Sequence, residues 1–177
     1  AFVCDRLSDV IGVALLGARI TVDQISGLGI QTAIVVTMAL AATIGFGMLM
    51  AHWLKRPAAE GLLSGGAVAI CGASAALAIS SVLPQSRENE RFTLLVVVGV
   101  TVMSTMAMVI YPFTALLMAL APQSAGIFLG GTIHDVAQVV AAGMMLGPQA
   151  GDTATVVKLF RVILLMPVVM IIVIAYR

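Results

Sequence analysis

Two neighbouring ionisable residues, His134 and Asp135, interrupt an apolar stretch of this sequence and are well suited to chemistry. The stretch Ala125–Leu146 contains no other charged residue. A carboxylate inside a membrane is costly unless it is paired, solvated or protonated. On a helix, Gln138 lies beside both residues, four positions after His134 and three after Asp135. This cluster predicts either a polar contact between packed helices or a site for a ligand or a proton.

Two cations, Lys158 and Arg161, stand three residues apart in the last apolar stretch. Lys158 is near the start of that stretch, and we expect its long side chain to extend to the membrane surface. Arg161 is deeper, and Val162–Met170, which follows it, contains no polar side chain. We expect Arg161 either to pair with Asp135 or to bind a divalent oxyanion.

A third irregular place is the segment 64–76, in which three glycines and two serines lie in the middle of an apolar stretch. Small residues of this kind allow close packing between membrane helices. They also permit a broken helix, whose free N–H groups and positive dipole end would face an anion. The candidate substrate-binding residues here are Gly66, Cys71, Gly72 and Ser74. The surroundings of Cys71 are apolar, which favours a packing role over a reactive thiol.

Several kinds of site find no support in the sequence. One histidine and one aspartate are too few for a metal centre, and His52 lies near the end of another apolar stretch. Cys4 and Cys71 form neither a disulfide framework nor a zinc motif. Motifs for nucleophilic catalysis and phosphate-binding loops are absent. We therefore expect no cofactor and no enzymatic activity, and we give a membrane-embedded hydrolase using His134 with Cys71 or Ser74 little weight.

The elements that carry these residues are predicted from composition. Of 177 residues, 61% are hydrophobic and only 10% are charged, and the mean hydropathy is +1.14. Soluble domains are about 25% charged, so a soluble enzyme or a disordered tail is excluded. A net charge of +1 does not provide the basic surface that binding to nucleic acid requires. The sequence predicts an all-α polytopic membrane protein in contact with the lipid bilayer.

Six apolar stretches are candidates for membrane segments, since a helix needs about 20 residues to cross the bilayer. The first is too short to cross alone, so we expect its helix to begin upstream in a longer protein, and we treat 1–177 as one membrane domain. The stretches are Leu7–Ala18, Leu28–Trp53, Gly61–Leu83, Phe92–Leu120, Ala125–Leu146 and Thr153–Tyr176.

If all six stretches cross, the basic residues divide almost equally between the two sides of the membrane, and the orientation stays open. One side collects Arg19, Arg87, Arg91, Lys158 and Arg161, and the other collects Arg6, Lys55, Arg56 and Arg177.

Two segments that contain most of the candidate site residues resemble signatures of a known family. Residues 66–76, GAVAICGASAA, and residues 132–143, TIHDVAQVVAAG, are similar to two signatures of the YeiH-like sulfate exporter family. Segments at 15–19, 111–112 and 154–162 match in order and spacing, so the resemblance covers nearly the whole chain. Asp135 stands where some members carry glutamate, which keeps the charge.

The resemblance implies a secondary transporter of the bacterial inner membrane. It also implies kinship with bile-acid, arsenite and cation–proton antiporter proteins, whose folds use inverted repeats and broken helices. Members are roughly twice this long, so the chain would be a central part. No repeat is evident within the chain, and we expect the second repeat to lie largely in the missing part.

Two functions follow from these observations. The first is export of sulfate, sulfite or a related small anion, with a proton taken up by His134 or Asp135. The alternative is a cation/proton antiporter, in which the same two residues relay the ion. Homo-oligomerisation is left open.

Three structural predictions accompany these functions. A break or tight crossing lies within Gly65–Ser74. The side chains of His134, Asp135 and Gln138 face the protein interior, and the two motifs lie side by side in one pocket. Arg161 is the expected cationic contributor to that pocket.

Overall fold

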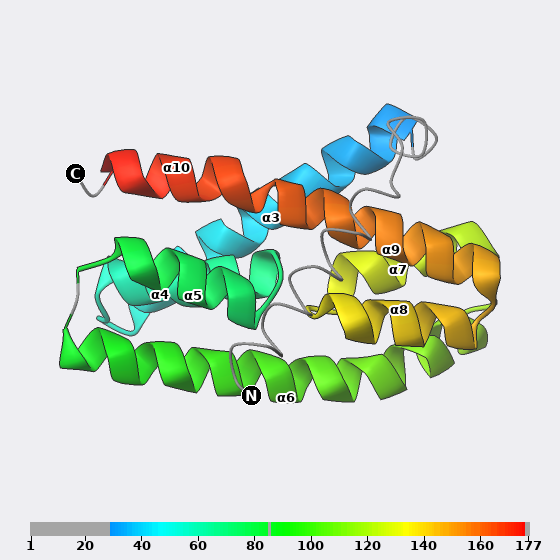
Figure 1. Ribbon diagram of the computed structural model, residues 1–177, viewed down its shortest axis with the longest axis horizontal. Coiled ribbons are helices and arrows are strands. Elements are labelled where there is room, and N and C mark those ends of the chain that lie inside the picture. The colour runs from blue at the N-terminus through cyan, green and yellow to red at the C-terminus, as the bar shows by residue number, and fades with distance from the viewer. Residues whose placement is uncertain (1–28, 85, 176–177) are drawn as a thin grey trace, which may run out of the picture.

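The computed structural model describes residues 29–84 and 86–175, and every helix or strand assigned in those ranges is an α-helix (Figure 1). The predicted all-α class is therefore confirmed for the described residues. The expected segment Leu7–Ala18 and the residues Cys4, Arg6 and Arg19 lie outside them. The helices are α3 (Gly29–Trp53), α4 (Ala58–Ala69), α5 (Ala73–Val82), α6 (Arg87–Leu117), α7 (Pro122–Thr132), α8 (Val136–Met145), α9 (Pro148–Ile163) and α10 (Leu165–Ala175).

Three helices in the described residues are long and apolar enough to cross a membrane. They are Gln31–Trp53 in α3, all of α6, and the run from α9 into α10, with 23, 31 and 27 residues. Large hydrophobic side chains such as Val35, Phe46 and Leu94 are exposed along these helices. Continuous exposed apolar surface of this size is typical of contact with lipid or with further helices.

The long helix α6 begins with a defined cap. The Ser86 hydroxyl accepts a hydrogen bond from the Asn89 amide at 3.1 Å, and Glu88 and Glu90 lie in the first turn. Acidic side chains there are favoured by the positive end of the helix dipole. Pro112 lies inside α6 without ending it, so α6 is one continuous helix that positions everything packed on it.

The helices α4 and α5 form a hairpin, hairpin 1, rather than one straight crossing. Gly66 in α4 is packed directly against Ile79 in α5. In a straight helix, residues thirteen positions apart would be about 20 Å from each other. The chain therefore turns back at residues 70–72, called tip 1. The predicted break within Gly65–Ser74 is present, but the prediction that Gly61–Leu83 runs through the membrane as one segment is wrong.

The helices α7 and α8 form a second hairpin, hairpin 2, in the same way. Gly130 in α7 and Gly143 in α8 both pack against Ala154 of α9. Two residues thirteen positions apart can share one neighbour only if the chain turns back between them, here at residues 133–135, called tip 2. The stretch Ala125–Leu146 is therefore also a hairpin and not a single crossing. Length and apolarity suggested a crossing for both stretches, but two short antiparallel helices fit the same number of residues.

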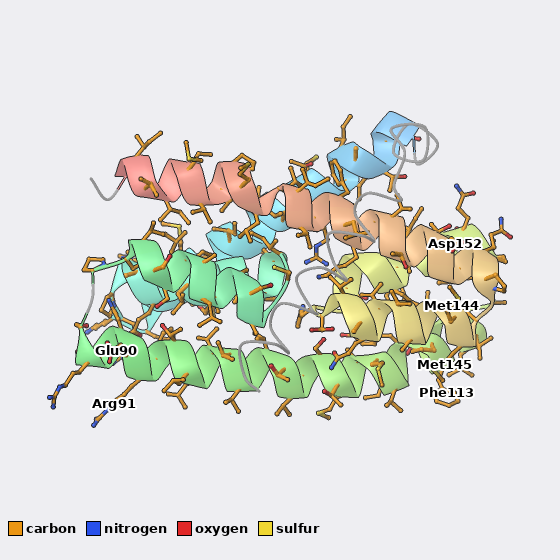
Figure 2. All side chains as sticks on the ribbon, in the orientation of Figure 1. Glu90, Arg91, Phe113, Met144, Met145 and Asp152 are labelled. Carbon is orange, nitrogen blue, oxygen red and sulfur yellow. The ribbon has the colours of Figure 1, made fainter. Side chains whose placement is uncertain are left out.

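The two hairpins lie along α6 from opposite ends, and their tips meet near its middle (Figure 1). Hairpin 1 packs on the first half of α6, where the Thr93 hydroxyl donates to the Ser80 hydroxyl at 3.0 Å. Tip 2 is bonded to Ser104, farther along α6. Figure 2 shows Glu90 and Arg91 at the end of the molecule where α6 begins, and Asp152 at the opposite end.

Glycines bring the long helices into direct contact with the hairpins. A Cβ added to Gly47 in α3 would lie 2.7 Å from the Cα of Gly65 in α4. A Cβ added to Gly143 in α8 would lie 2.7 Å from the Cα of Gly151 in α9. Backbone contact of this kind is the usual way in which membrane helices associate closely. Close packing is therefore the function of these glycines.

Candidate functional site

The two tips enclose a small cavity against α6. A Cβ added to Gly72 in tip 1 would lie 3.3 Å from the Cβ of His134 in tip 2, so the two motifs lie side by side. The cavity has a volume of about 20 Å³, measured as space open to the centre of a water molecule. One water needs about 10–15 Å³ by this measure. Its lining residues are Cys71, Gly72, Ala73, Val100, Thr101, Ser104, His134 and Asp135.

Tip 1 presents an uncapped helix start to this cavity. Gly72 precedes α5 with φ +66°, a left-handed conformation that glycine adopts without strain. No side chain in the described residues caps α5, and its first residue, Ala73, lines the cavity. The first amides of a helix lack partners within it and carry partial positive charge. Tip 1 therefore offers backbone donors rather than charged side chains.

The other predicted residues of hairpin 1 have structural roles. Gly66 is buried against Ile79 and does not line the cavity. Ser74 is exposed, and its hydroxyl donates to the Cys71 sulfur at 2.8 Å and the Cys71 carbonyl oxygen at 3.3 Å. Cys71 is buried at the tip and lines the cavity.

Tip 2 carries its own acidic cap. The Asp135 carboxylate accepts hydrogen bonds from the amides of Ala137 and Gln138, at 2.8 and 3.2 Å, and so closes the start of α8. The side-chain amide of Gln138 donates to the Thr105 hydroxyl at 3.1 Å. Among the described residues, Nδ1 of His134 and Oε1 of Gln138 are buried without a partner.

The expectation that all three polar residues face the interior is correct only in part. His134 and Gln138 are half-buried, whereas Asp135 is exposed on the described part of the chain. Both amide hydrogen bonds of its carboxylate go to Oδ1, so the capping role of Asp135 does not require the side chain to be buried.

Arg161 of α9 joins the ends of α4 and α7. Its Nε and both terminal nitrogens donate five hydrogen bonds to backbone carbonyls, and the residue is 6% exposed. A guanidinium has five N–H donors, so all of them are engaged. In the described residues Arg161 therefore pairs with backbone carbonyls and not with Asp135 as expected, and its binding of an oxyanion stays a prediction. The acceptors are the carbonyls of Val68, Ala69, Gly130 and Gly131.

Lys158 lies at the same junction and does not extend to the membrane surface. The residue is completely buried. Its Nζ donates to the carbonyl oxygen of Ile70 in tip 1 at 2.5 Å and to that of Ile133 in tip 2 at 3.0 Å. The expectation that Lys158 snorkels is wrong because its ammonium finds two carbonyl groups inside the protein.

The arrangement separates two kinds of helix end. The carbonyl ends of α4 and α7 contact Lys158 and Arg161. The N-terminal ends of α5 and α8 lie on the cavity side. No side chain caps the first amides of α5, whereas the Asp135 carboxylate caps those of α8. Lys158 and Arg161 of α9 and Asp135 of tip 2 together carry a formal charge of +1 beside the cavity.

Sequence reasoning missed the contribution of α6. The Ser104 hydroxyl accepts hydrogen bonds from the amides of His134 and Asp135, at 3.2 and 3.1 Å, and this residue is 1% exposed. Thr101 and Thr105 flank Ser104 on the same face of the helix. These three hydroxyl residues at spacings of three and four within an apolar helix were the available signal.

The comparisons with known proteins identify the family of the chain. A family model described as conserved hypothetical protein 698 matches residues 8–177. The chain is 54% identical over 161 residues to UPF0324 membrane protein CT0845 of Chlorobaculum tepidum, which covers 91% of the chain and 45% of that protein. It is 55% identical over 161 residues to UPF0324 membrane protein RB0971 of Rhizobium meliloti, and the match covers 91% of the chain and 47% of that protein. It is 50% identical over 160 residues to UPF0324 membrane protein TauZ of Paracoccus denitrificans, and that match covers 90% of the chain and 47% of the relative.

The chain spans about half the length of the curated relatives it matches. No solved structure matches it. The family match, the high identities and the apolar helices all support the resemblance found in the two sequence signatures. The chain belongs to the UPF0324 family of membrane proteins, which is the YeiH-like family.

Proposed function

We propose that this chain forms the central part of a secondary transporter of the bacterial inner membrane that binds a small inorganic anion, such as sulfate or sulfite, between its two tips. The observation that carries the proposal is the meeting of two broken helical hairpins at a cavity beside two buried cations. The cavity has room for about one water, so the tips would move apart to admit the anion. Secondary transporters typically bind substrate near the bilayer midplane, at discontinuous helices.

The order of the elements supports a transporter. Hairpin 1 is followed by the long helix α6, and hairpin 2 is followed by the long run of α9 and α10. Each hairpin and the long helix that follows it form one unit, and the two units run in opposite directions (Figure 1), as the halves of an inverted repeat do. We infer that both units of this repeat lie within the chain, although the sequence led us to expect the second in a missing part.

The charges support an anion rather than a metal cation as the substrate. Lys158 and Arg161 stand opposite a single carboxylate, Asp135, and that carboxylate is already bonded to two backbone amides. No group of three or more His, Cys, Asp or Glu side chains that could hold a metal ion is found in the described residues. A cation/proton antiporter is the alternative outcome of the test, in which the carboxylate of Asp135 at the cavity would be the ion-binding group.

Two groups at tip 2 are suited to carry a coupling proton. His134 lines the cavity, and its buried Nδ1 lacks a partner among the described residues. Asp135 lines the same cavity and is exposed. A proton gained by either group would add positive charge beside the anion, so proton and anion would bind together.

The test is thermal unfolding of the purified full-length protein in detergent, with sulfate, sulfite and chloride compared against sodium at several pH values. A ligand that binds the native state raises the unfolding temperature by mass action. We expect sulfate or sulfite to stabilise the protein and sodium to have no effect. Stabilisation by sodium and by no anion would favour the antiporter instead.

Asp135→Asn sharpens this test because asparagine keeps the oxygen that caps α8 and removes the negative charge. We expect the variant to remain folded, to bind the anion several-fold more tightly near neutral pH, and to lose much of the pH dependence of binding. Asp152→Asn is the matched control, because Asp152 is exposed in the first turns of α9 and lies outside the cavity. Equal anion affinity and equal pH dependence in the native protein and Asp135→Asn would remove Asp135 from the mechanism.

A further inference from the structure

We propose that Lys158 is a tethered monovalent cation that joins the two tips, in the place where a transporter with broken helices would otherwise hold a metal ion such as Na⁺. The protein then needs no bound alkali cation to hold its tips together. The part of this inference that concerns substrate rests on the proposed function, and the joining of the tips does not.

The contacts of the ammonium group carry the inference. Nζ of Lys158 lies 2.5 Å from the carbonyl oxygen of Ile70 and 3.0 Å from that of Ile133. These carbonyls belong to different hairpins, and Lys158 itself is on a third element, α9. The ammonium is completely buried, so water does not replace either contact. One positive charge therefore holds together two tips that approach from opposite ends of the molecule.

The acceptors are groups that need a cation. Ile70 and Ile133 directly follow the last residues of α4 and α7. The last carbonyls of a helix lack donors within it and carry partial negative charge. In transporters with discontinuous helices, such carbonyls coordinate Na⁺ or a proton-bearing group. Here the same kind of oxygen pair contacts an ammonium that is covalently part of the chain.

Arg161 also binds carbonyls of both hairpins, but it cannot replace Lys158 as the cation between the tips. Its five donors are used by carbonyls at and before the ends of α4 and α7, and none of them contacts Ile70 or Ile133. Guanidinium is a flat fork, whereas ammonium is a compact point charge that resembles an alkali cation. Loss of the Lys158 ammonium would therefore leave two facing carbonyls with no donor among the described residues, and the site would be open to another cation.

The first experiment uses the native full-length protein. Its unfolding temperature and its anion titration are measured in buffers in which sodium and potassium are replaced by N-methylglucamine. We expect the unfolding temperature to change by less than about 1 °C, because the site is already occupied by a cation that cannot leave. A clear requirement for sodium or potassium would overturn the proposal, and this measurement does not depend on any variant being folded.

The second experiment removes the ammonium and returns it as a free molecule. Lys158→Ala deletes three carbons and the nitrogen, which together have the shape of n-propylammonium. We expect the variant to unfold about 5–10 °C lower than the native protein, since two buried carbonyls lose their donor. At tens of millimolar, n-propylammonium should restore at least half of that loss. The uncharged analogue 1-propanol and the fully substituted tetramethylammonium should restore none.

The control variant is Lys55→Ala, because Lys55 is exposed in the turn between α3 and α4. It should unfold close to the native temperature and show no response to n-propylammonium. If Lys158→Ala unfolds at the native temperature, or if 1-propanol restores it as well as n-propylammonium, Lys158 is only a packing residue and the proposal fails. The unfolding temperatures are measured without sulfate or sulfite, so these results stand even if neither anion proves to bind.

Discussion

Tip 1 and tip 2 each connect two antiparallel helices, but they differ in whether a side chain caps the second of these helices. At tip 1, Gly72 begins α5 without a side-chain cap. At tip 2, Asp135 begins α8 with its own carboxylate bonded to two amides. Tip 1 touches α6 through Val100, at 3.5 Å from a Cβ added to Gly72, whereas tip 2 is hydrogen-bonded to Ser104.

This difference predicts a different role for each tip. An open helix start attracts an anion, and a closed one does not, because the capping carboxylate already occupies it. In the proposed function, tip 1 is therefore the side of the cavity that would hold the anion. Tip 2 supplies the titratable side chains and is fixed to α6. A pair of hairpins with equal backbone geometry can thus have unequal chemistry through one residue at the start of each second helix.

Ser104→Ala should break the contact that fixes tip 2, and it has the larger expected effect. The amides of His134 and Asp135 both lose their acceptor in a buried place. An unsatisfied buried donor costs about 1–3 kcal/mol. We expect a lower free energy of unfolding and faster amide hydrogen exchange at residues 133–138, with residues 70–74 unchanged. Equal acceleration at both tips would mean that the tips are not independently held.

Gly72→Ala tests tip 1, with a smaller expected effect. Gly72 has φ +66° and ψ −119°, and holding a non-glycine residue in such a sparsely populated conformation costs about 1–3 kcal/mol. The new Cβ would lie 3.3 Å from the Cβ of His134. We expect modest destabilisation together with weaker stabilisation by anion. The matched control is Gly99→Ala in α6, where an added Cβ has no neighbour within 4 Å, so this variant should be as stable as the native protein or more so. Unchanged anion binding in Gly72→Ala would argue against tip 1 as the anion side.

The sequence predicted the break at tip 1 and singled out the polar residues of tip 2, because glycine, serine and ionisable residues are rare within apolar stretches. It placed His134, Asp135 and Gln138 on one continuous helix, and the break between α7 and α8 was not predicted. The break near Cys71 and the proximity of Gly72 to His134 agree with those predictions. The path of the chain at each break did not follow from the sequence. About 22 apolar residues fit either one crossing or two short helices packed together, and only contacts such as Gly66 with Ile79 distinguish them.

The roles of the two cations could not be predicted for a different reason. Their partners are backbone carbonyls, which every residue possesses, so no side-chain pattern marks them. Lys158 looked like a surface-seeking residue because it lies near the start of an apolar stretch. In the folded chain, the carbonyl ends of α4 and α7 are close enough to satisfy it.

The hairpins also change which loops share a side of the membrane, because a hairpin begins and ends on the same side. Within the described residues, all lysines and arginines other than Lys158 and Arg161 lie at the end of the molecule where α6 begins. Lys55 and Arg56 are in the turn after α3, and Arg87 and Arg91 are in the first two turns of α6, whereas the loops at residues 118–121 and 146–147 carry none. Short loops rich in lysine and arginine stay in the cytoplasm. We therefore expect the turn after α3 to be cytoplasmic and the turn between α6 and α7 to be periplasmic. A single cysteine introduced by Ala119→Cys should react with a membrane-impermeant maleimide added outside the cell, and one introduced by Leu54→Cys should not.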